Sequence, residues 1–429
     1  MGGSQPDHLA STRRNIPIKL AISYVFDWVV IFAAIGIATV LGDIEPNKRP
    51  FSLNDPDISF PFTESEAVPT WLLVVLMGAV PFVVIAIVSL IFVPGATVPA
   101  NTPASLVWKR KLWELHVGWL GLFLSIGSAF FFTSGMKNLF GKPRPDLLAR
   151  CQPDLENIQK HVVGGFAGEN PLGLLYAASV CTQKDAHKLD DGFRSYPSGH
   201  SSTASAGLVY LSLFLASKFA VTIPFAVPQA GSSPLSHAAF PSRVQAENNW
   251  DNRSEASTPS NSKPSHNAKI SSLRRQAAAP PIYLLVLTLA PFCGSIYIAS
   301  SRWYDFRHHG FDILFGYLMG LATAIYSFRY YHLPIQEGAG WAWGPRSSDR
   351  AFWAGVGRLG YTDNPESESP APIASDRIGV SNDMEIQDHD HHAESGPSHM
   401  TQRPVAYGAS GYNEGPFQDV EMHRMDNRI

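Results

Sequence analysis

The segment SRWYDFRHHGFD, which ends at Asp312, has the residue types and spacing of a nucleophile with an orienting group. His308 and Asp312 are four residues apart. On a helix beginning near residue 307 they share a face, and the carboxylate reaches one ring nitrogen. The carboxylate then fixes the tautomer, and the other nitrogen stays free to attack. His309 is expected to point elsewhere, and Asp305 and Arg307, which lack a partner by spacing, are interpreted as interfacial surface residues.

A second segment, YPSGHSSTASAG (196–207), is predicted to bind an anion. Pro197 and Gly199 predict a turn, and the apolar run that follows places Ser198, Gly199 and His200 in the first turn of a helix. Free backbone N–H groups and the helix dipole attract anions there. The alternative is a plain helix cap, in which Ser198 caps the helix and His200 is incidental.

A third segment, KNLFGKPRP (137–145), presents two cations at a helix exit. Pro143 and Pro145 stop the helix and favour an extended chain around Arg144, while Lys137 ends the apolar run before it. Such cations can bind an anion. Alternatively, they extend from the membrane edge toward water and have no catalytic role.

The elements that must position these segments are long apolar runs. A bilayer core of roughly 30 Å takes about 20 helical residues, and six runs are long enough. They are 22–41, 71–93, 117–136, 200–220, 281–300 and 313–331. The fold class predicted is therefore all-α: a polytopic membrane protein with a bundle of six transmembrane helices.

Loop charges predict the orientation of the bundle. The segment before the first run carries Arg13, Arg14 and Lys19, the next loop is acidic, and the loop after the second run is basic at 109–111. Lys and Arg favour the cytoplasmic side, so we expect both termini in the cytosol. The three segments then share the extracytosolic or lumenal side, although the organelle (vacuole, ER/Golgi or plasma membrane) is open.

Two polar regions fall outside the apolar runs. Residues 222–280 are rich in Ser, Pro, Asn and Ala, and cannot bury enough apolar surface to offset their ordering entropy. We therefore expect a disordered cytoplasmic insertion, whose sequon at Asn252 should carry no glycan. The chain divides into a membrane domain, 1–332, and a polar, mostly disordered cytoplasmic tail, 333–429, in which the histidines of 388–394 are interpreted as solvated rather than metal-binding.

The order Lys-x6-Arg-Pro, Pro-Ser-Gly-His, Ser-Arg-x5-His-x3-Asp resembles the signature of the type 2 phosphatidic acid phosphatase superfamily. Within its membrane branch of lipid phosphate phosphatases, the spacing over roughly 15–335 is similar to the fungal diacylglycerol pyrophosphate phosphatase group. All signature positions match. Vanadium-dependent haloperoxidases share the motif set but are soluble.

The resemblance implies phosphoryl transfer through a phosphohistidine. His308 would attack phosphorus, held by Asp312, while His200 would protonate the leaving oxygen and later activate water. The signature residues expected to bind phosphate are Lys137, Arg144, Ser198, Gly199 and Arg302. No metal or other cofactor is expected, because three cations already neutralise the phosphate and no acidic cluster offers ligands for magnesium.

A site at the bilayer rim suits membrane phospholipid phosphates: phosphatidate, lysophosphatidate, diacylglycerol pyrophosphate or sphingoid phosphates. No basic stripe indicates nucleic-acid binding, and the oligomeric state is open.

One rival interpretation is a transporter, although charges inside the apolar runs are few, such as Asp27 and Lys218. Another is a catalytically silent relative that binds lipid.

Three cysteines are present. Cys151 and Cys181 fall in one predicted extracytosolic loop, where an oxidising compartment permits a disulfide between them. Cys293 lies within the fifth apolar run and is interpreted as a small apolar residue.

Overall fold

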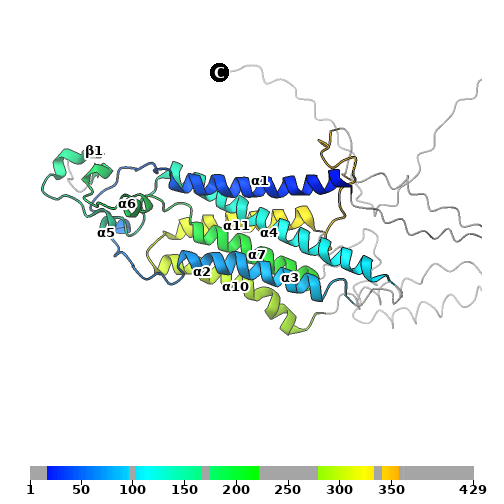
Figure 1. Ribbon diagram of the computed structural model, residues 1–429. Helices are drawn as coiled ribbons and strands as arrows, with labels where there is room; N and C mark the ends of the chain where they lie inside the picture. The colour runs from blue at the N-terminus through cyan, green and yellow to red at the C-terminus, as the bar shows by residue number, and fades with distance from the viewer. Residues whose placement is uncertain are drawn as a thin grey trace, which may run out of the picture. The chain divides into compact units, whose positions relative to one another are not determined.

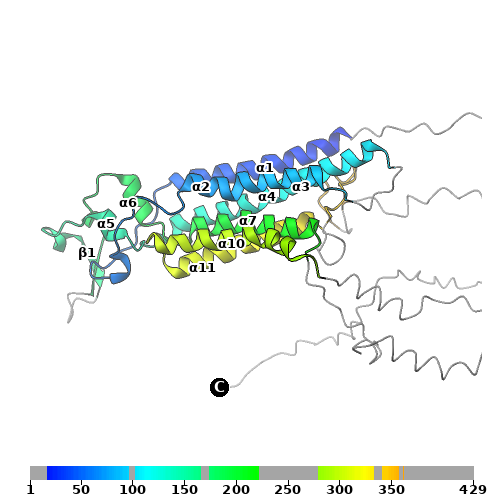
Figure 2. The ribbon, with the colours of Figure 1, turned by 90° about the horizontal axis from the view of Figure 1, so that it is seen from below.

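The computed structural model describes residues 17–95, 102–165, 173–221, 279–332, 341–356 and 361. Long helices form a bundle, and a small cap of short elements lies at one end of it (Figures 1 and 2). The bundle helices are α1 (Ile18–Asp43), α2 (Thr70–Val74), α3 (Val80–Ile91), α4 (Ala104–Phe140), α7 (Gly199–Lys218), α10 (Ile282–Tyr304) and α11 (Gly310–Tyr331). A π-helical turn, Val75–Ala79, joins α2 to α3.

Among the described residues, five helices are long and apolar enough to cross a membrane. They are α1, the continuous helix Thr70–Ile91, α4, α10 and α11. These five coincide with predicted runs. The predicted run at 200–220 is also a helix, α7, with 20 residues. Its mean hydropathy is lower than that of the five others, because its first turns are rich in serine. The all-α membrane fold is thus confirmed, and the count of six spans stays a prediction.

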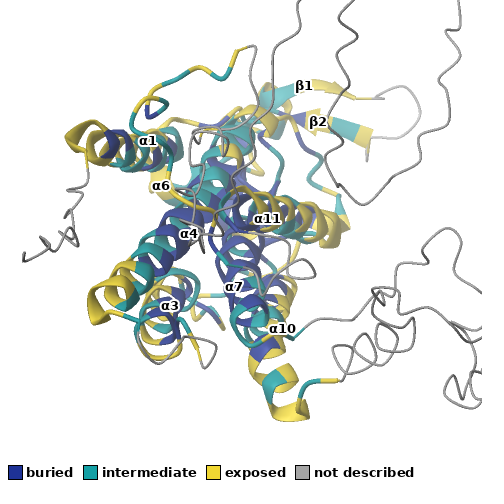
Figure 3. Ribbon diagram, turned by 90° about the vertical axis from the view of Figure 1, so that its right-hand side faces the viewer, coloured by how far each residue is buried: buried dark blue, intermediate teal, exposed yellow. Residues whose placement is uncertain are grey.

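The helix α7 lies at the centre of the bundle, which explains its composition. Nearly every residue from Ser201 to Leu211 is buried, and the burial colouring in Figure 3 shows α7 enclosed by its neighbours. Small residues let those neighbours approach closely. A Cβ atom on Gly320 of α11 would overlap the Ser202 carbonyl, and one on Gly207 would overlap the Met77 carbonyl. A helix surrounded by protein needs no lipid-facing surface, so it can carry polar residues.

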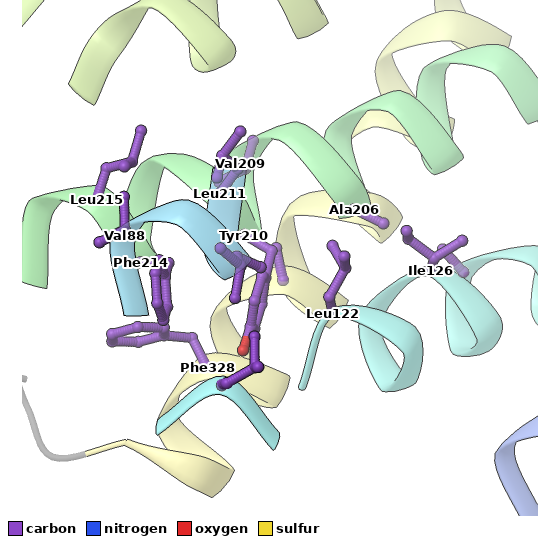
Figure 4. Packing of buried hydrophobic residues seen from close by; sticks show 14 residues of the cluster. Val88, Leu122, Ile126, Ala206, Val209, Tyr210, Leu211, Phe214, Leu215 and Phe328 are labelled. Carbon is purple, nitrogen blue, oxygen red and sulfur yellow. The ribbon is translucent and has the colours of Figure 1, made fainter. Parts of the chain in front are cut away.

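An apolar core joins α3, α4, α7 and α11 below the polar end of α7. Tyr210, Phe214 and Phe328 lie at its centre, with smaller aliphatic side chains around them (Figure 4). The Tyr210 hydroxyl donates to the Gly118 carbonyl at 3.0 Å, so its polar atom is paired. This core fixes the depth of α7 relative to α4 and α11, and thereby the position of its first turn.

The cap is built from the chain between α4 and α7 together with the loop between α1 and α2. It contains α5 (Leu147–Cys151), α6 (Ala186–Gly192) and an antiparallel pair, β1 (Val162–Gly165) and β2 (Leu174–Tyr176). Three short 3₁₀ turns, Pro56–Ile58, Ile158–His161 and Ala178–Val180, complete the loops. A disulfide joins Cys151 and Cys181, whose Cα atoms are 4.6 Å apart. The cap has its own apolar core, which includes Phe51, Leu147 and Phe193.

Part of the predicted tail packs on the end of the bundle away from the cap (Figure 1). The Trp113 indole donates to the Trp343 carbonyl at 2.8 Å, and the Ala342 amide donates to the buried carboxylate of Glu114 at 3.1 Å. Glu114 also pairs with Lys218 at 2.6 Å. Residues 341–346 are therefore part of the folded unit. The predicted insertion, except for residues 279 and 280, and the histidines at 388–394 lie outside the described residues.

Candidate active site

The first cationic segment turns sharply at the end of α4. Lys137 lies in the last turn, and Gly141 ends the helix in the left-handed conformation with φ 55°, which glycine adopts at little cost. The chain then runs beside the segment that follows α6. The Arg144 amide donates to the Gly192 carbonyl at 2.8 Å, and the Ser195 amide donates to the Lys142 carbonyl at 3.0 Å. These bonds place Arg144 against the residues that lead into α7.

The second segment begins α7 and meets Lys137 directly. Ser198 is the N-cap, since its hydroxyl accepts from the Ser201 amide at 3.4 Å. The alternative reading of Ser198 as a helix cap is thus correct in geometry. A Cβ atom on Gly199 would lie 3.1 Å from the Lys137 ammonium nitrogen. The ammonium therefore lies against the first turn of α7, where backbone N–H groups are free to bind an anion.

The third segment connects α10 to α11 and carries His308 in the connection itself. Nδ1 of His308 donates to the Ser195 carbonyl at 2.6 Å, because a carbonyl oxygen can only accept. The proton is thereby fixed on Nδ1, which leaves a lone pair on Nε2. Tautomer and orientation are both those of an imidazole ready to attack through Nε2.

The predicted pairing of His308 with Asp312 is wrong. Helix α11 begins at Gly310, so His308 lies outside it and the expected helical face does not exist. Asp312 instead accepts from the Ser195 hydroxyl at 2.6 Å and from Lys142 at 2.8 Å, and Nδ1 of His309 lies 3.1 Å from the same carboxylate. Its influence on His308 is indirect. It holds the side chain of the same serine whose carbonyl holds the imidazole.

The neighbour His309 has a structural role. It is the N-cap of α11 and forms a capping box with Asp312. Nε2 of His309 donates to the Asp57 carbonyl at 3.2 Å. Both ring nitrogens are thus engaged in holding the helix start and the cap loop. The spacing argument therefore assigned the wrong histidine to Asp312, because it placed the helix start near residue 307 instead of at Gly310.

The ring of His308 is buried, with 3 % of its surface exposed. Burial, then the positive charges of Arg144 and Lys137, lower the pKa of His308 well below the ordinary 6.5. The ring is therefore neutral at physiological pH, the form that can act as a nucleophile. The same interactions show that these two cations and His308 lie in one electrostatic environment.

The remaining histidine of the site, His200, lies beside Arg302. Its Nε2 donates to the Val68 carbonyl at 3.2 Å, and Nη2 of Arg302 donates to the same carbonyl at 3.0 Å. His200 also interacts electrostatically with Lys137 and Arg144. The three segments, far apart in sequence, thus converge on one cationic region at the cap end of the bundle.

The three cations of the site differ in their partners. Arg144 pairs with Asp191 at 2.6 Å, and Arg302, 1 % exposed, pairs with Glu66 at 2.8 Å and Asp305 at 2.7 Å. Lys137 forms no ion pair with any carboxylate in the described ranges. The Nε of Arg144 is likewise buried without an acceptor among the residues described. Donors are therefore available for an anion between Lys137 and Arg144.

The surface location expected for Asp305 and Arg307 is wrong. Their exposed fractions are 1 % and 6 %. Asp305 accepts from Arg302 at 2.7 Å, and Arg307 pairs with Glu66 at 2.8 Å. The pair of Arg302 with Asp305, three residues apart at the end of α10, could have been found from spacing. Spacing within 301–312 could not reveal Glu66, which comes from the loop before α2, and the acidic character of that loop was its only sequence signal.

Comparison with known proteins is consistent with this geometry. Relatives include diacylglycerol pyrophosphate phosphatase 1 of Saccharomyces cerevisiae, 29 % identical over 68 % of this chain and 74 % of the relative. Lipid phosphate phosphatase 2 of Arabidopsis thaliana is 26 % identical over 77 % of this chain and 85 % of the relative. No solved structure matches the chain significantly. The model of the PAP2 superfamily matches residues 118–335, which contain all three segments, and the chain therefore belongs to the PAP2 superfamily.

Proposed function

We propose that this protein is a membrane lipid phosphate phosphatase that hydrolyses terminal phosphate groups through a phosphohistidine at His308. The observation that carries the proposal is the state of this imidazole. It is buried and neutral, its Nδ1 proton is fixed by the Ser195 carbonyl, and it lies in the field of Lys137 and Arg144. A neutral imidazole beside anion-binding cations is suited to attack on phosphorus.

The reaction follows from the roles that these positions can perform. Lys137, Arg144 and the first turn of α7 bind the phosphate oxygens, with Arg302 beside His200. The bond from Nε2 of His308 to phosphorus forms as the bond to the lipid oxygen breaks, and His200, in its protonated form, gives that oxygen the proton on Nδ1. Water then attacks phosphorus and passes a proton to His200, which releases phosphate and restores His308.

The substrate class rests on where the site lies. The site is at one end of a bundle of apolar helices, so a lipid headgroup can reach it while the acyl chains stay in the bilayer. Relatives of this chain are named for diacylglycerol pyrophosphate and for lipid phosphates. We propose phosphatidate, lysophosphatidate and diacylglycerol pyrophosphate as substrates.

The disulfide between Cys151 and Cys181 supports an extracytosolic or lumenal location for this end of the bundle. Disulfides form and persist in oxidising compartments, and this bond lies in the cap beside the site. The described start of the chain lies at the opposite end of the bundle (Figure 1). A cytosolic amino terminus is consistent with that arrangement.

The function is tested by phosphate release from a panel of purified lipid phosphates with EDTA present. The purified protein should release phosphate from phosphatidate without added metal, since side-chain cations neutralise the substrate. From diacylglycerol pyrophosphate it should release inorganic phosphate first and leave phosphatidate, because the site binds a terminal phosphoryl group. Release of intact pyrophosphate, or no release from any lipid in the panel, would contradict the proposal.

The pH dependence of kcat/KM should show the lowered pKa of His308. The neutral nucleophile is present above this pKa and is lost as the pH falls through it, so the acid limb should lie below pH 6.5. Arg144→Gln should slow the reaction and also move this limb to higher pH, since Arg144 is, after burial, the largest cause of the low pKa. A pH series on the two proteins measures both effects. An unmoved limb, or a wild-type limb above pH 6.5, would contradict the assignment.

A further inference from the structure

The two arginines of the site each hold a carboxylate from outside the family signature. Nη2 of Arg144 is 2.6 Å from Asp191, at the end of α6, and Nη1 of Arg302 is 2.8 Å from Glu66, in the loop before α2. Neither carboxylate is part of the three sequence segments. Each one limits the orientations that its guanidinium can adopt before a phosphate arrives.

Arg307 links these two ion pairs into one chain of contacts. Its Nη2 is 2.8 Å from Glu66, and its Nη1 lies at longer range from two carboxylates, 3.7 Å from Asp146 and 3.9 Å from Asp191. The contacts therefore run from Arg302 through Glu66, Arg307 and Asp191 to Arg144. We call the three middle residues the Glu66–Arg307–Asp191 bridge. Arg307 directly precedes His308, so the bridge also borders the nucleophile.

The cap anchors the bridge on the side of Asp191. The second carboxylate oxygen of Asp191 is 2.9 Å from Nη1 of Arg150, which lies next to the disulfide at Cys151. The Phe62 ring lies against the guanidinium groups of Arg150 and Arg307, at 4.8 and 4.7 Å from its centroid. These contacts leave the carboxylate little freedom to turn away from Arg144.

The charge state of Asp191 fits this arrangement. Burial alone would raise the pKa of its carboxyl, but Arg144, Arg150 and Lys137 together hold the pKa well below its ordinary value. The carboxylate thus stays ionised across the physiological range. It offsets part of the mutual repulsion of the surrounding cations, which would otherwise push their side chains apart.

We propose that Glu66, Arg307 and Asp191 are positioning residues that hold Arg144 and Arg302 in their phosphate-binding orientations and couple the two. The inference deepens the proposed function and rests on it. The bridge does not touch phosphorus or the leaving group in this scheme. It sets in advance the geometry of two guanidinium groups, so that less conformational entropy is lost when the phosphate and its transition state bind.

The main test compares two adjacent aspartates of α6. Asp191→Asn removes the charge that holds Arg144, and kcat/KM should fall about 10- to 100-fold, the scale of a small misplacement of reacting groups. Inhibition by orthovanadate, a mimic of the transferred phosphoryl group, should weaken as well. Asp190→Asn is the matched control. It removes an ion pair with Lys48 at 2.8 Å on the same short helix, and should leave both values within about twofold.

Coupling through Arg307 is tested by a double-mutant cycle. Glu66→Gln should also lower kcat/KM, and the double variant with Asp191→Asn should lose less than the product of the two single losses, because each change already loosens the shared arginine. Arg307→Lys should keep more activity than Arg307→Met, since it keeps a charge between the two carboxylates. If the loss of kcat/KM in the double variant equals the product of the two single losses, Arg307 does not couple the two carboxylates.

Direct binding of orthovanadate separates this inference from the proposed function. It is measured by calorimetry on the purified full-length protein and needs no turnover. If wild-type protein binds vanadate but hydrolyses no lipid phosphate, the proposed function is wrong. The role of the bridge is then still tested, because Asp191→Asn should bind vanadate more weakly than wild type. Equal vanadate affinity in Asp191→Asn and Asp190→Asn would overturn the bridge. If Asp191→Asn does not fold, Glu66→Gln, on a loop, carries the same comparison.

Discussion

Replacement of His308 by glutamine should lower phosphate release by about 10⁴-fold or more, the scale seen when a covalent nucleophile is removed. Nδ1 of His308 donates to the Ser195 carbonyl, which leaves the lone pair on Nε2 for attack on phosphorus. Glutamine is of similar size but has no comparable nucleophile. The measurement is the initial rate of phosphate release from phosphatidate in detergent micelles, with trapping of the phosphoenzyme from labelled substrate.

The adjacent His309 provides a matched control. In His309→Asn, asparagine keeps an N-cap acceptor for α11, because asparagine is among the preferred N-cap residues. Turnover should stay within an order of magnitude of wild type, and labelled phosphate should still be trapped. If His309→Asn were inactive and His308→Gln active, the nucleophile would be His309 and the proposed scheme would be wrong.

The second large effect is expected at Lys137. Lys137→Met keeps most of the length and apolar contacts of the side chain but removes its charge. Because the Lys137 ammonium has no carboxylate partner in the described chain and lies against Gly199, its loss directly weakens phosphate binding. The kcat/KM for phosphatidate should fall about 10²- to 10³-fold, as when one oxyanion-binding donor is removed.

Lys160→Met is the control for this change of charge. Lys160 is exposed on the cap and donates to Asn157 at 2.8 Å, away from the three segments, so its removal should leave kcat/KM near the wild-type value. Equal activity of the two variants would show that Lys137 does not bind the phosphate. Thermal unfolding of both proteins, followed by fluorescence, separates loss of fold from loss of charge.

The chemistry of the site could be predicted from sequence because each segment carries a local signal. Proline and glycine residues mark where a helix ends or begins, and the apolar runs place those ends at the membrane edge. These local signals point to Lys137, His200 and His308. The structure brings their segments together, as the contact of Gly199 with Lys137 shows.

The partners of these residues could not be predicted in the same way. The rule that pairs residues four apart holds only inside a helix, and α11 begins two residues too late for His308 to obey it. The carbonyl that orients His308 belongs to Ser195, 113 positions away. A backbone carbonyl carries no sequence signal, since every residue has one.

Burial of charge was the other point where local reasoning failed. Asp305 and Arg307 look like surface residues in a polar stretch between two apolar helices. In the fold they lie beneath the cap, where Glu66 and Arg302 neutralise them. The polar first turns of α7 are a related case, because this helix is surrounded by other helices instead of lipid.

The order of residue types along this chain was sufficient to predict the helices and the three segments that the fold brings together at one end of the bundle, since turns, apolar length and motif spacing are local properties. Folding alone decided which groups hold the imidazole of His308 and its cations in place. Glu66, Arg307 and the pair Asp191 and Ser195 come from three separate stretches, and their contacts exist only because the cap closes over the end of the bundle. Contacts between distant stretches depend on how helices pack, and packing is a property of the whole chain.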